Sequence, residues 1–169
     1  MEKTDAEALF RYASDPTVGP IAGWQPHTSV EYSKEIITSV LSSPETYAVV
    51  WKANGTPIGS IGLLFGTASS LSQTAGECEL GYWIGRSYWG QGIATEAAQA
   101  ILRHAFEDLC ITKVWCGSYE GNERSSSVQR KCGFRFVRKD INAEVPQMNE
   151  KRNVTVNCLT KEEWRSIVK

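Results

Sequence analysis

Gly90 and Gly92 stand directly before an amphipathic segment, a pattern whose chemistry is the binding of a phosphate. From Ala97 to Leu109 the apolar residues follow the i, i+3, i+4 spacing of a helix with one buried face. The first turn of a helix has backbone N–H groups without partners, and the helix dipole adds partial positive charge there. Glycines ahead of that turn let an anion approach the main chain. Residues 90–95 are therefore expected to hold a phosphate or pyrophosphate, although a turn that only reverses the chain has the same pattern.

Two common nucleotide-binding motifs do not fit this turn. The dinucleotide fingerprint needs a third glycine where this chain has Thr95. The triphosphate-binding loop needs a Gly-Lys-Ser/Thr run, and none follows either glycine. Both classes of nucleotide site are therefore excluded here.

The elements that position the turn can be predicted from the flanking residues. Leu80–Ile84 is rich in β-forming and aromatic residues and ends at Gly85, which predicts a strand. Lys113–Tyr119 is predicted to be the next strand. A strand, a helix and a second strand in this order imply a parallel, right-handed β-α-β unit.

The glycine turn and a second block resemble the motifs of the GNAT superfamily of N-acetyltransferases. The family's pyrophosphate motif is Gln/Arg-x-x-Gly-x-Gly/Ala, and Trp89–Ala94 matches its later fixed positions, with Trp89 replacing the first. The second block, from Asn122 through Ser125 to Lys131-x-Gly133-Phe134, matches the family's Asn-x-x-Ser/Ala…Lys-x-Gly-Phe pattern. Gly81–Ile84 together with Gly90–Ala97 is typical of the branch that resembles enzymes acetylating ribosomal-protein N-termini.

This resemblance implies a fold and a donor. The fold is α/β: a GNAT-type mixed, mostly antiparallel sheet with a central splayed parallel β-α-β unit and helices on both faces. The donor is acetyl-CoA. Its pyrophosphate is expected on the main chain of the turn and its pantetheine arm along the strand end, with Asn122 closing the other side. The implied binding residues are Trp83, Ile84, Gly85, Gly90, Gln91, Gly92, Ile93, Ala94, Thr95 and Asn122. For Trp83, core packing is the alternative role.

Ser125 is the residue that the resemblance assigns to the leaving thiolate. Relatives often have a tyrosine on this helix, but its register holds Gln129 here. The ribosomal-protein-like branch uses the serine three residues after the asparagine. A hydroxyl is a weak acid, so the expected role is a hydrogen bond to sulfur. Ser125 is also a suitable helix N-cap, and one side chain could serve both roles.

Two carboxylates compete for the role of general base. Glu144 is expected in a loop after the strand that begins at Phe134, and it aligns with an Ala-Glu pair of the ribosomal-protein branch. Glu79 lies on the strand beside the reactive centre and could act through a water. For each, a solvated carboxylate without a catalytic role is the alternative, and neither need be the base, because an α-amino group titrates near 8 and needs only a modest acceptor.

The N-terminal part is expected to shape the acceptor pocket. Asp5–Ala13 reads as a first helix, and the strand that the family places before it is missing or vestigial. A glycine- and proline-rich loop, residues 16–27, carries Trp24, which either lines the substrate pocket or only pins the loop. A capping box at Thr28-x-x-Glu31 predicts a helix through Val40. Next, Asn54-Gly55 predicts a hairpin with a type I′ turn.

The remainder completes one expected domain, residues 1–169. A short helix is expected from Ser125 to Cys132, with Ser126 and Ser127 solvated. Two strands should follow, Phe134–Ile141 and Asn153–Leu159. Thr160-x-x-Glu163 is expected to cap a last helical turn.

Composition narrows the class of function. The net charge of −1 gives no electrostatic case for nucleic-acid or membrane partners. The N-terminus has no apolar signal segment, so a cytoplasmic protein is expected. The five cysteines are scattered and are expected to be buried thiols, and two histidines give no zinc-type cluster. No metal is expected, and the protein is expected to be a monomer or homodimer.

The predicted function is transfer of the acetyl group of acetyl-CoA to a primary amine by direct attack in a ternary complex. The acceptor is a protein N-terminal α-amine or a small molecule such as an amino acid, polyamine or aminoglycoside. A non-catalytic acyl-CoA-binding module is the alternative from another class, since it would keep the turn and need neither Ser125 nor a carboxylate.

Overall fold

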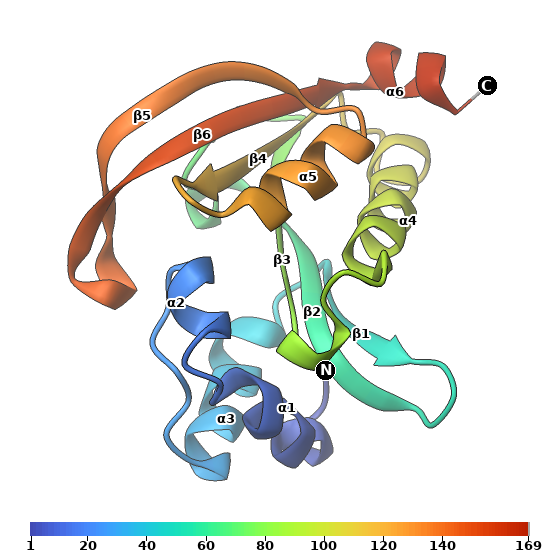
Figure 1. Cartoon of the computed structure of the whole chain (residues 1–169). Helices are drawn as coiled ribbons and strands as arrows, with labels where there is room; N and C mark the ends of the chain where they lie inside the picture. Colours follow the sequence, from blue (N-terminus) through green and yellow to red (C-terminus); the bar gives the residue numbers. More distant parts are fainter. Residues whose placement is uncertain (169) are drawn as a thin grey trace. The chain divides into compact units, whose positions relative to one another are not determined.

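Residues 1–168 of the computed structural model form a six-stranded sheet with helices around it (Figure 1). The strands are β1 (Thr46–Trp51), β2 (Thr56–Leu64), β3 (Glu77–Ile84), β4 (Lys113–Tyr119), β5 (Arg135–Val145) and β6 (Glu150–Thr160). The helices are α1 (Ala6–Ala13), α2 (Val18–Ala22), α3 (Val30–Ile36), α4 (Ile93–Glu107), α5 (Glu123–Lys131) and α6 (Lys161–Ile167). A π-helical turn, Ile37–Leu41, extends α3.

The sheet is mixed, as predicted. Its order is β1-β2-β3-β4-β6-β5. The pairs β1–β2, β4–β6 and β5–β6 are antiparallel, and β3–β4, joined through α4, is parallel. Within residues 1–168 β1 is the first strand along the chain and an edge strand, and no strand precedes α1 there.

The parallel pair is short and then opens. Its register joins Glu77–Glu79 to Lys113–Trp115, whereas β3 continues to Ile84 and β4 to Tyr119. Backbone groups beyond these pairs must find other partners. The Leu80 carbonyl is one such group, and its partner is the Cys116 thiol, which donates to it at 3.4 Å. The expected splay is therefore present in the described chain.

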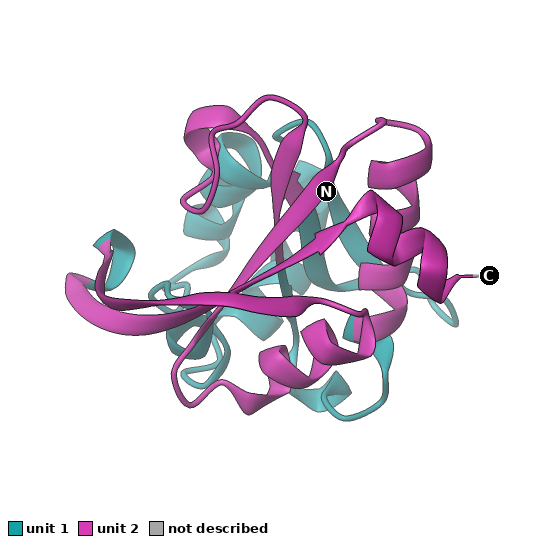
Figure 2. Cartoon of the chain, turned by 90° about the horizontal axis from the view of Figure 1, so that it is seen from above, with its two compact units in different colours: residues 1–62, 82–94, 146–148 teal, residues 63–81, 95–145, 149–169 magenta. Residues whose placement is uncertain are grey.

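The chain forms two compact units (Figure 2). The first contains residues 1–62, 82–94 and 146–148. Its apolar core comes from α1 and the π-helical turn after α3, and Trp24 and Trp83 pack against this cluster. The core residues are Ala6, Leu9, Ala13, Ile37 and Leu41.

The second unit contains residues 63–81, 95–145 and the chain from 149 onward. One face of α4 is buried, as its spacing predicted, and Phe106 at its end packs on Trp164 of α6 with ring centroids 5.2 Å apart. The capping box that starts α6 is present, with the Thr160 and Glu163 side chains each bonded to the other's backbone N–H.

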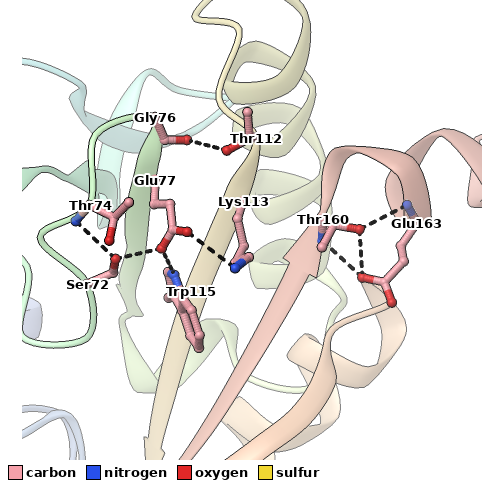
Figure 3. Close-up of polar contacts among 9 residues, drawn as sticks. All are labelled: Ser72, Thr74, Gly76, Glu77, Thr112, Lys113, Trp115, Thr160 and Glu163. Carbon is pink, nitrogen blue, oxygen red and sulfur yellow. Dashed lines mark hydrogen bonds and ion pairs between the residues drawn. The ribbon is translucent and has the colours of Figure 1, made fainter.

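The partly buried carboxylate of Glu77 connects β3 to β4 at the end where the two strands pair (Figure 3). Glu77 accepts hydrogen bonds from Ser72 Oγ and Trp115 Nε1, both at 2.6 Å, and its other oxygen lies 3.2 Å from Lys113 Nζ. Beside it, Thr112 donates to the Gly76 carbonyl from both N–H and hydroxyl. Burial alone would raise the pKa of Glu77, but these hydrogen bonds and the Lys113 charge outweigh it and lower the pKa.

Three local predictions in the first unit are corrected. The loop after α1 contains the short helix α2, whose Pro20 lies in the first turn, where a missing N–H is tolerated. The β1–β2 connection is not a type I′ turn, because Gly55 has a positive φ (71°) and Asn54 has not. The third correction moves the start of α3 by one residue. Its N-cap is Ser29, whose Oγ accepts from Tyr32 N at 3.0 Å, and not Thr28.

This shift of the cap gives a direct test. Ser29→Ala should lower the free energy of unfolding by about 1 kcal/mol, since it removes the side-chain acceptor for an N–H of the first turn. Thr28→Ala is the matched control and should leave the urea midpoint nearly unchanged. A larger loss for Thr28→Ala would contradict the observed cap.

The last two strands are longer than predicted. β5 runs from Arg135 to Val145 and β6 from Glu150 to Thr160, so the expected loop shrinks to a 3₁₀ turn, Pro146–Met148. Long cross-strand pairing extends both strands past the segments whose alternation was visible in the sequence.

One prediction about the cysteines is also corrected. Cys110 was expected to be buried, and its side chain is exposed.

Candidate active site

The turn before α4 has an open main chain. Gly90 and Gly92 have φ values of +76° and +83°, the left-handed region that favours glycine. Within the described chain, a Cβ built on either would meet no heavy atom within 4 Å. An ion can therefore approach this backbone without displacing protein atoms.

Side chains around the turn bond back to the segment that precedes it. Trp89 Nε1 donates to the Ile84 carbonyl at 2.6 Å, and Gln91 Nε2 donates to the Ser87 carbonyl at 3.0 Å. Trp89 thus has a structural role at the position where the family motif has Gln or Arg. Both bonds tie the turn to the end of β3 and the 3₁₀ turn Arg86–Tyr88.

The end of β3 is closely packed. Gly85 N–H donates to the Ile58 carbonyl at 2.7 Å, and a Cβ on Gly85 would lie 2.7 Å from the Tyr12 ring. Ile84 is buried. Trp83 packs on the core cluster of the first unit and contacts Trp24 edge-on at 5.7 Å between centroids. Core packing of Trp83 is therefore real, and any contact with a ligand would be an additional role.

Trp24 pins the segment after α2. Its N–H donates to the Gly19 carbonyl at 3.0 Å, and a Cβ on Gly19 would lie 2.6 Å from its ring. The same ring contacts the buried imidazole of His27 at 5.4 Å between centroids. The alternative role, that Trp24 fixes a loop, is present in the structure, and a pocket-lining role stays a prediction.

Asn122 and Ser125 form the start of α5. Asn122 is the N-cap, and its Oδ1 accepts from Ser125 N at 3.2 Å. Ser125 is therefore inside the first turn and is not the cap. Ser126 was expected to be solvated, but its Oγ lies within hydrogen-bond distance, 3.2 Å, of Ser118 Oγ.

Glu79 holds a loop. Its Oε2 accepts from Ser69 Oγ at 2.9 Å, Ser70 N at 2.7 Å and Leu71 N at 3.2 Å. Both Glu79 and this loop belong to the second unit. Both carboxylate oxygens of Glu79 thus have protein donors, and the side chain holds this loop in place.

Glu144 is not in a loop, which corrects the prediction. It lies on β5 opposite Lys151 of β6, and its Oε1 is 2.8 Å from Lys151 Nζ. Its side chain is 67% exposed. The structure thus places it on a strand, in an ion pair largely open to water.

Sequence reasoning missed two buried amides. Gln129 on α5 and Asn157 on β6 are 1% and 9% exposed and bond to each other. One feature of the sequence could have indicated the burial of Gln129. It follows Val128 on a short amphipathic helix, at the position where relatives often have a tyrosine. A polar residue on a buried face needs partners.

The buried thiols are held protonated. Burial raises the pKa of Cys78 to about 12 and that of Cys132 to about 11, and it raises the pKa of Cys116 further. The thiolate is the nucleophilic form of cysteine. These three thiols are therefore unsuited to accept an acyl group.

Residues 1–168 lack two features that mark other classes of protein. No group of three or more His, Cys, Asp or Glu side chains there could hold a metal ion. Among those same residues, no helix combines the length and apolarity needed to cross a bilayer.

Known proteins match this chain along most of its length. Residues 1–135 fit the family model described as "Acetyltransferase (GNAT) domain", which includes the turn, Asn122 and Ser125 but not Glu144. "Uncharacterized N-acetyltransferase p20" of Bacillus licheniformis is 29% identical over 119 residues, 68% of this chain and 64% of that protein. "Putative ribosomal N-acetyltransferase YdaF" of Bacillus subtilis is 37% identical over 65 residues, 38% of this chain and 36% of that protein.

The fold has solved counterparts as well. A GNAT-family acetyltransferase from Bacillus anthracis superposes with a TM-score of 0.81 at 21% identity, covering 96% of this chain and 93% of that one. The matched stretches span less than two thirds of the length of each of the two sequence relatives above. The match to the ribosomal relative confirms the resemblance to that branch. The family model covers well over half of the residues, and the chain belongs to the GNAT family of acetyltransferases.

Proposed function

We propose that this protein transfers the acetyl group of acetyl-CoA to a primary amine. The observation that carries the proposal is the turn before α4, where Gly90 and Gly92 leave the main chain open at the start of a 15-residue helix. Family membership supports the same activity.

The donor fits residues of this turn. Main-chain N–H groups from Gln91 to Thr95, including Ile93 and Ala94, would hold its pyrophosphate, because helix N-termini attract anions. The pantetheine amides would bond the strand end Trp83–Gly85. The left-handed φ values and the open space at Gly90 and Gly92 support this assignment.

Transfer is direct in this proposal. The amine nitrogen attacks the thioester carbonyl, the new C–N bond forms, the C–S bond breaks and coenzyme A leaves as a thiolate. The protonated state of Cys78, Cys116 and Cys132 supports a route without an acyl-enzyme. Ser125 donates a hydrogen bond to the departing sulfur.

The acceptor we propose is the α-amine of a peptide. Glu79 is engaged by a loop and Glu144 by Lys151, so neither carboxylate stands ready as a dedicated base. An α-amine, with a pKa near 8, loses its proton to water more readily than a lysine or polyamine amine near 10. The name of the ribosomal relative supports the same class of acceptor.

Release of free thiol from acetyl-CoA tests this function. We expect turnover with N-terminal peptides and none with amino acids, polyamines or aminoglycosides. Ser125→Ala should lower kcat by about tenfold, and Glu144→Gln should change it by less than about threefold, far below the 10²–10⁴-fold that a general base contributes.

Each other outcome has a defined meaning. Turnover confined to one small amine would replace the peptide acceptor but keep the enzyme. Protection of the fold by acetyl-CoA without any thiol release would favour a binding module, because a ligand that binds only the folded state stabilises it. A loss of a hundredfold or more in Glu144→Gln would restore that carboxylate as the base.

A further inference from the structure

We propose that Gln129 is a positioning residue that orients the hydroxyl of Ser125 toward the leaving sulfur. This inference rests on the function proposed above. It concerns two side-chain amides that have no role in the transfer as described so far, Gln129 and Asn157. They lie on α5 and β6, the two elements labelled in Figure 1.

Every hydrogen-bonding atom of the Gln129 amide has a partner, and these partners determine which end of the amide is NH₂ and which is oxygen. Nε2 donates to the Gly117 carbonyl at 3.1 Å and to Ser125 Oγ at 3.2 Å. Oε1 accepts from Asn157 Nδ2 at 2.6 Å. A backbone carbonyl can only accept, so the end of the amide that faces Gly117 must be the NH₂ group. Both of its hydrogens and its oxygen are thereby used.

This arrangement restricts the Ser125 proton. An amide NH₂ group cannot accept, so Ser125 Oγ is the acceptor along the line to Gln129 and its own hydrogen must point elsewhere. The Asn122 cap holds the Ser125 backbone through its N–H. The serine is thus fixed at both ends, as a positioned donor requires.

The bonds run in one direction. Asn157 donates to Gln129, Gln129 donates to Ser125, and Ser125 donates to the sulfur. Hydrogen bonds in such a chain polarise one another, which strengthens the last donor. When the C–S bond breaks, the thiolate charge is stabilised by this hydrogen bond, and the proton that the amine loses goes to water.

A purely structural role makes a different prediction. Gln129 also satisfies the Gly117 carbonyl on β4, beyond the last paired residue of the parallel strands. Loss of that bond would lower stability whatever residue stands at position 125. Action through Ser125, by contrast, requires that the effect on kcat vanish when the Ser125 hydroxyl is absent.

The experiment is a double-mutant cycle on the full chain with acetyl-CoA and the best peptide acceptor. Gln129→Met keeps the length of the side chain and removes its donors. We expect kcat to fall about fivefold, the loss of one hydrogen bond, with KM for acetyl-CoA within about twofold. In the Ser125→Ala background, Gln129→Met should cause no further loss of kcat, while it lowers the melting temperature in both backgrounds.

A neighbouring hydroxyl provides the matched control. Ser126→Ala removes the hydroxyl next along α5, which bonds toward Ser118 and not to Gln129, and should leave kcat unchanged. If Gln129→Met does not fold, Asn157→Leu removes the donor to Gln129 and should show the same dependence on Ser125 with a two- to threefold loss.

Four results would overturn the inference. An unchanged kcat in Gln129→Met, beside a reduced one in Ser125→Ala, would do so while the proposed function stands. Losses that multiply in the double variant would assign Gln129 a structural role only. Full activity in Ser125→Ala would show that the Ser125 hydroxyl has no part in the transfer, so Gln129 would have nothing to position. Absence of turnover by the wild type with every amine would remove the proposed function, and the inference with it.

Discussion

Replacing Gly92 with aspartate should weaken the binding of acetyl-CoA by about a hundredfold or more, from two independent costs. The φ of +83° disfavours any residue with a Cβ. The new carboxylate would also stand against the pyrophosphate, and two like charges about 4 Å apart repel by about 4 kcal/mol near a protein surface, before screening by salt. Calorimetric titration with acetyl-CoA measures the loss, and each tenfold change corresponds to about 1.4 kcal/mol.

Two variants separate charge from backbone strain. Gly92→Ala carries the strain without the charge and should lose much less affinity. Gly55→Asp places the same side chain at another left-handed glycine, with φ +71° and open space around it, in the β1–β2 turn. It should leave binding unchanged. Wild-type affinity in Gly92→Asp would show that the anion does not bind at this turn.

The parts of this site that could be predicted from sequence are local. Gly90 and Gly92 determine their own backbone geometry, and the apolar spacing after them shows which face of α4 is buried. β4 has the predicted bounds, Lys113–Tyr119, because its alternation spans the whole strand. Each feature depends on residues within about one helical turn or one strand.

What could not be predicted depends on partners far along the chain. Glu144 was expected in a loop because its own neighbours carry no clear alternation, yet pairing with β6 extends β5 through it. The N-cap of α3 is Ser29 and not the predicted Thr28, although Tyr32 stands where a capping box needs Glu or Gln, so the motif alone favoured the wrong residue. Contacts across the sheet decided the first case, and backbone geometry decided the second.

The side-chain networks show the same limit. Glu79 bonds a loop eight to ten residues before it, and Gln129 bonds Asn157, which is 28 residues away. The sequence predicted only that Glu79 and Asn157 lie on strands and Gln129 on a helix, and periodicity cannot name a partner. The roles of polar residues near the site therefore became visible only with the fold.

Loss of the Glu77 carboxylate should be among the most destabilising single changes outside the apolar cores. Glu77→Ala leaves Trp115 Nε1, Ser72 Oγ and the Lys113 ammonium without their acceptor, and the side chain that it removes is only 13% exposed. Removing the acceptor of a partly buried ion pair and of two hydrogen bonds leaves their donors unsatisfied, so we expect a loss of about 2 kcal/mol in urea unfolding. Glu144→Ala is the matched control: its partner is also a lysine, Lys151, but this pair is exposed and should contribute little.

Acid should remove this stabilisation. The pKa of Glu77 is lowered in the fold, so its charged form favours the native state; the contribution is complete above the unfolded pKa, near 4.3, and is lost as the pH falls through the folded value. The difference in unfolding free energy between wild type and Glu77→Gln should thus be constant above about pH 5 and shrink below it, because a protonated glutamate resembles glutamine. A difference that stays the same at pH 3 and pH 7 would show that Glu77 acts through shape alone. A shrinking difference would identify its charge as the element that holds β3 and β4 together at Glu77–Glu79, before the strands separate.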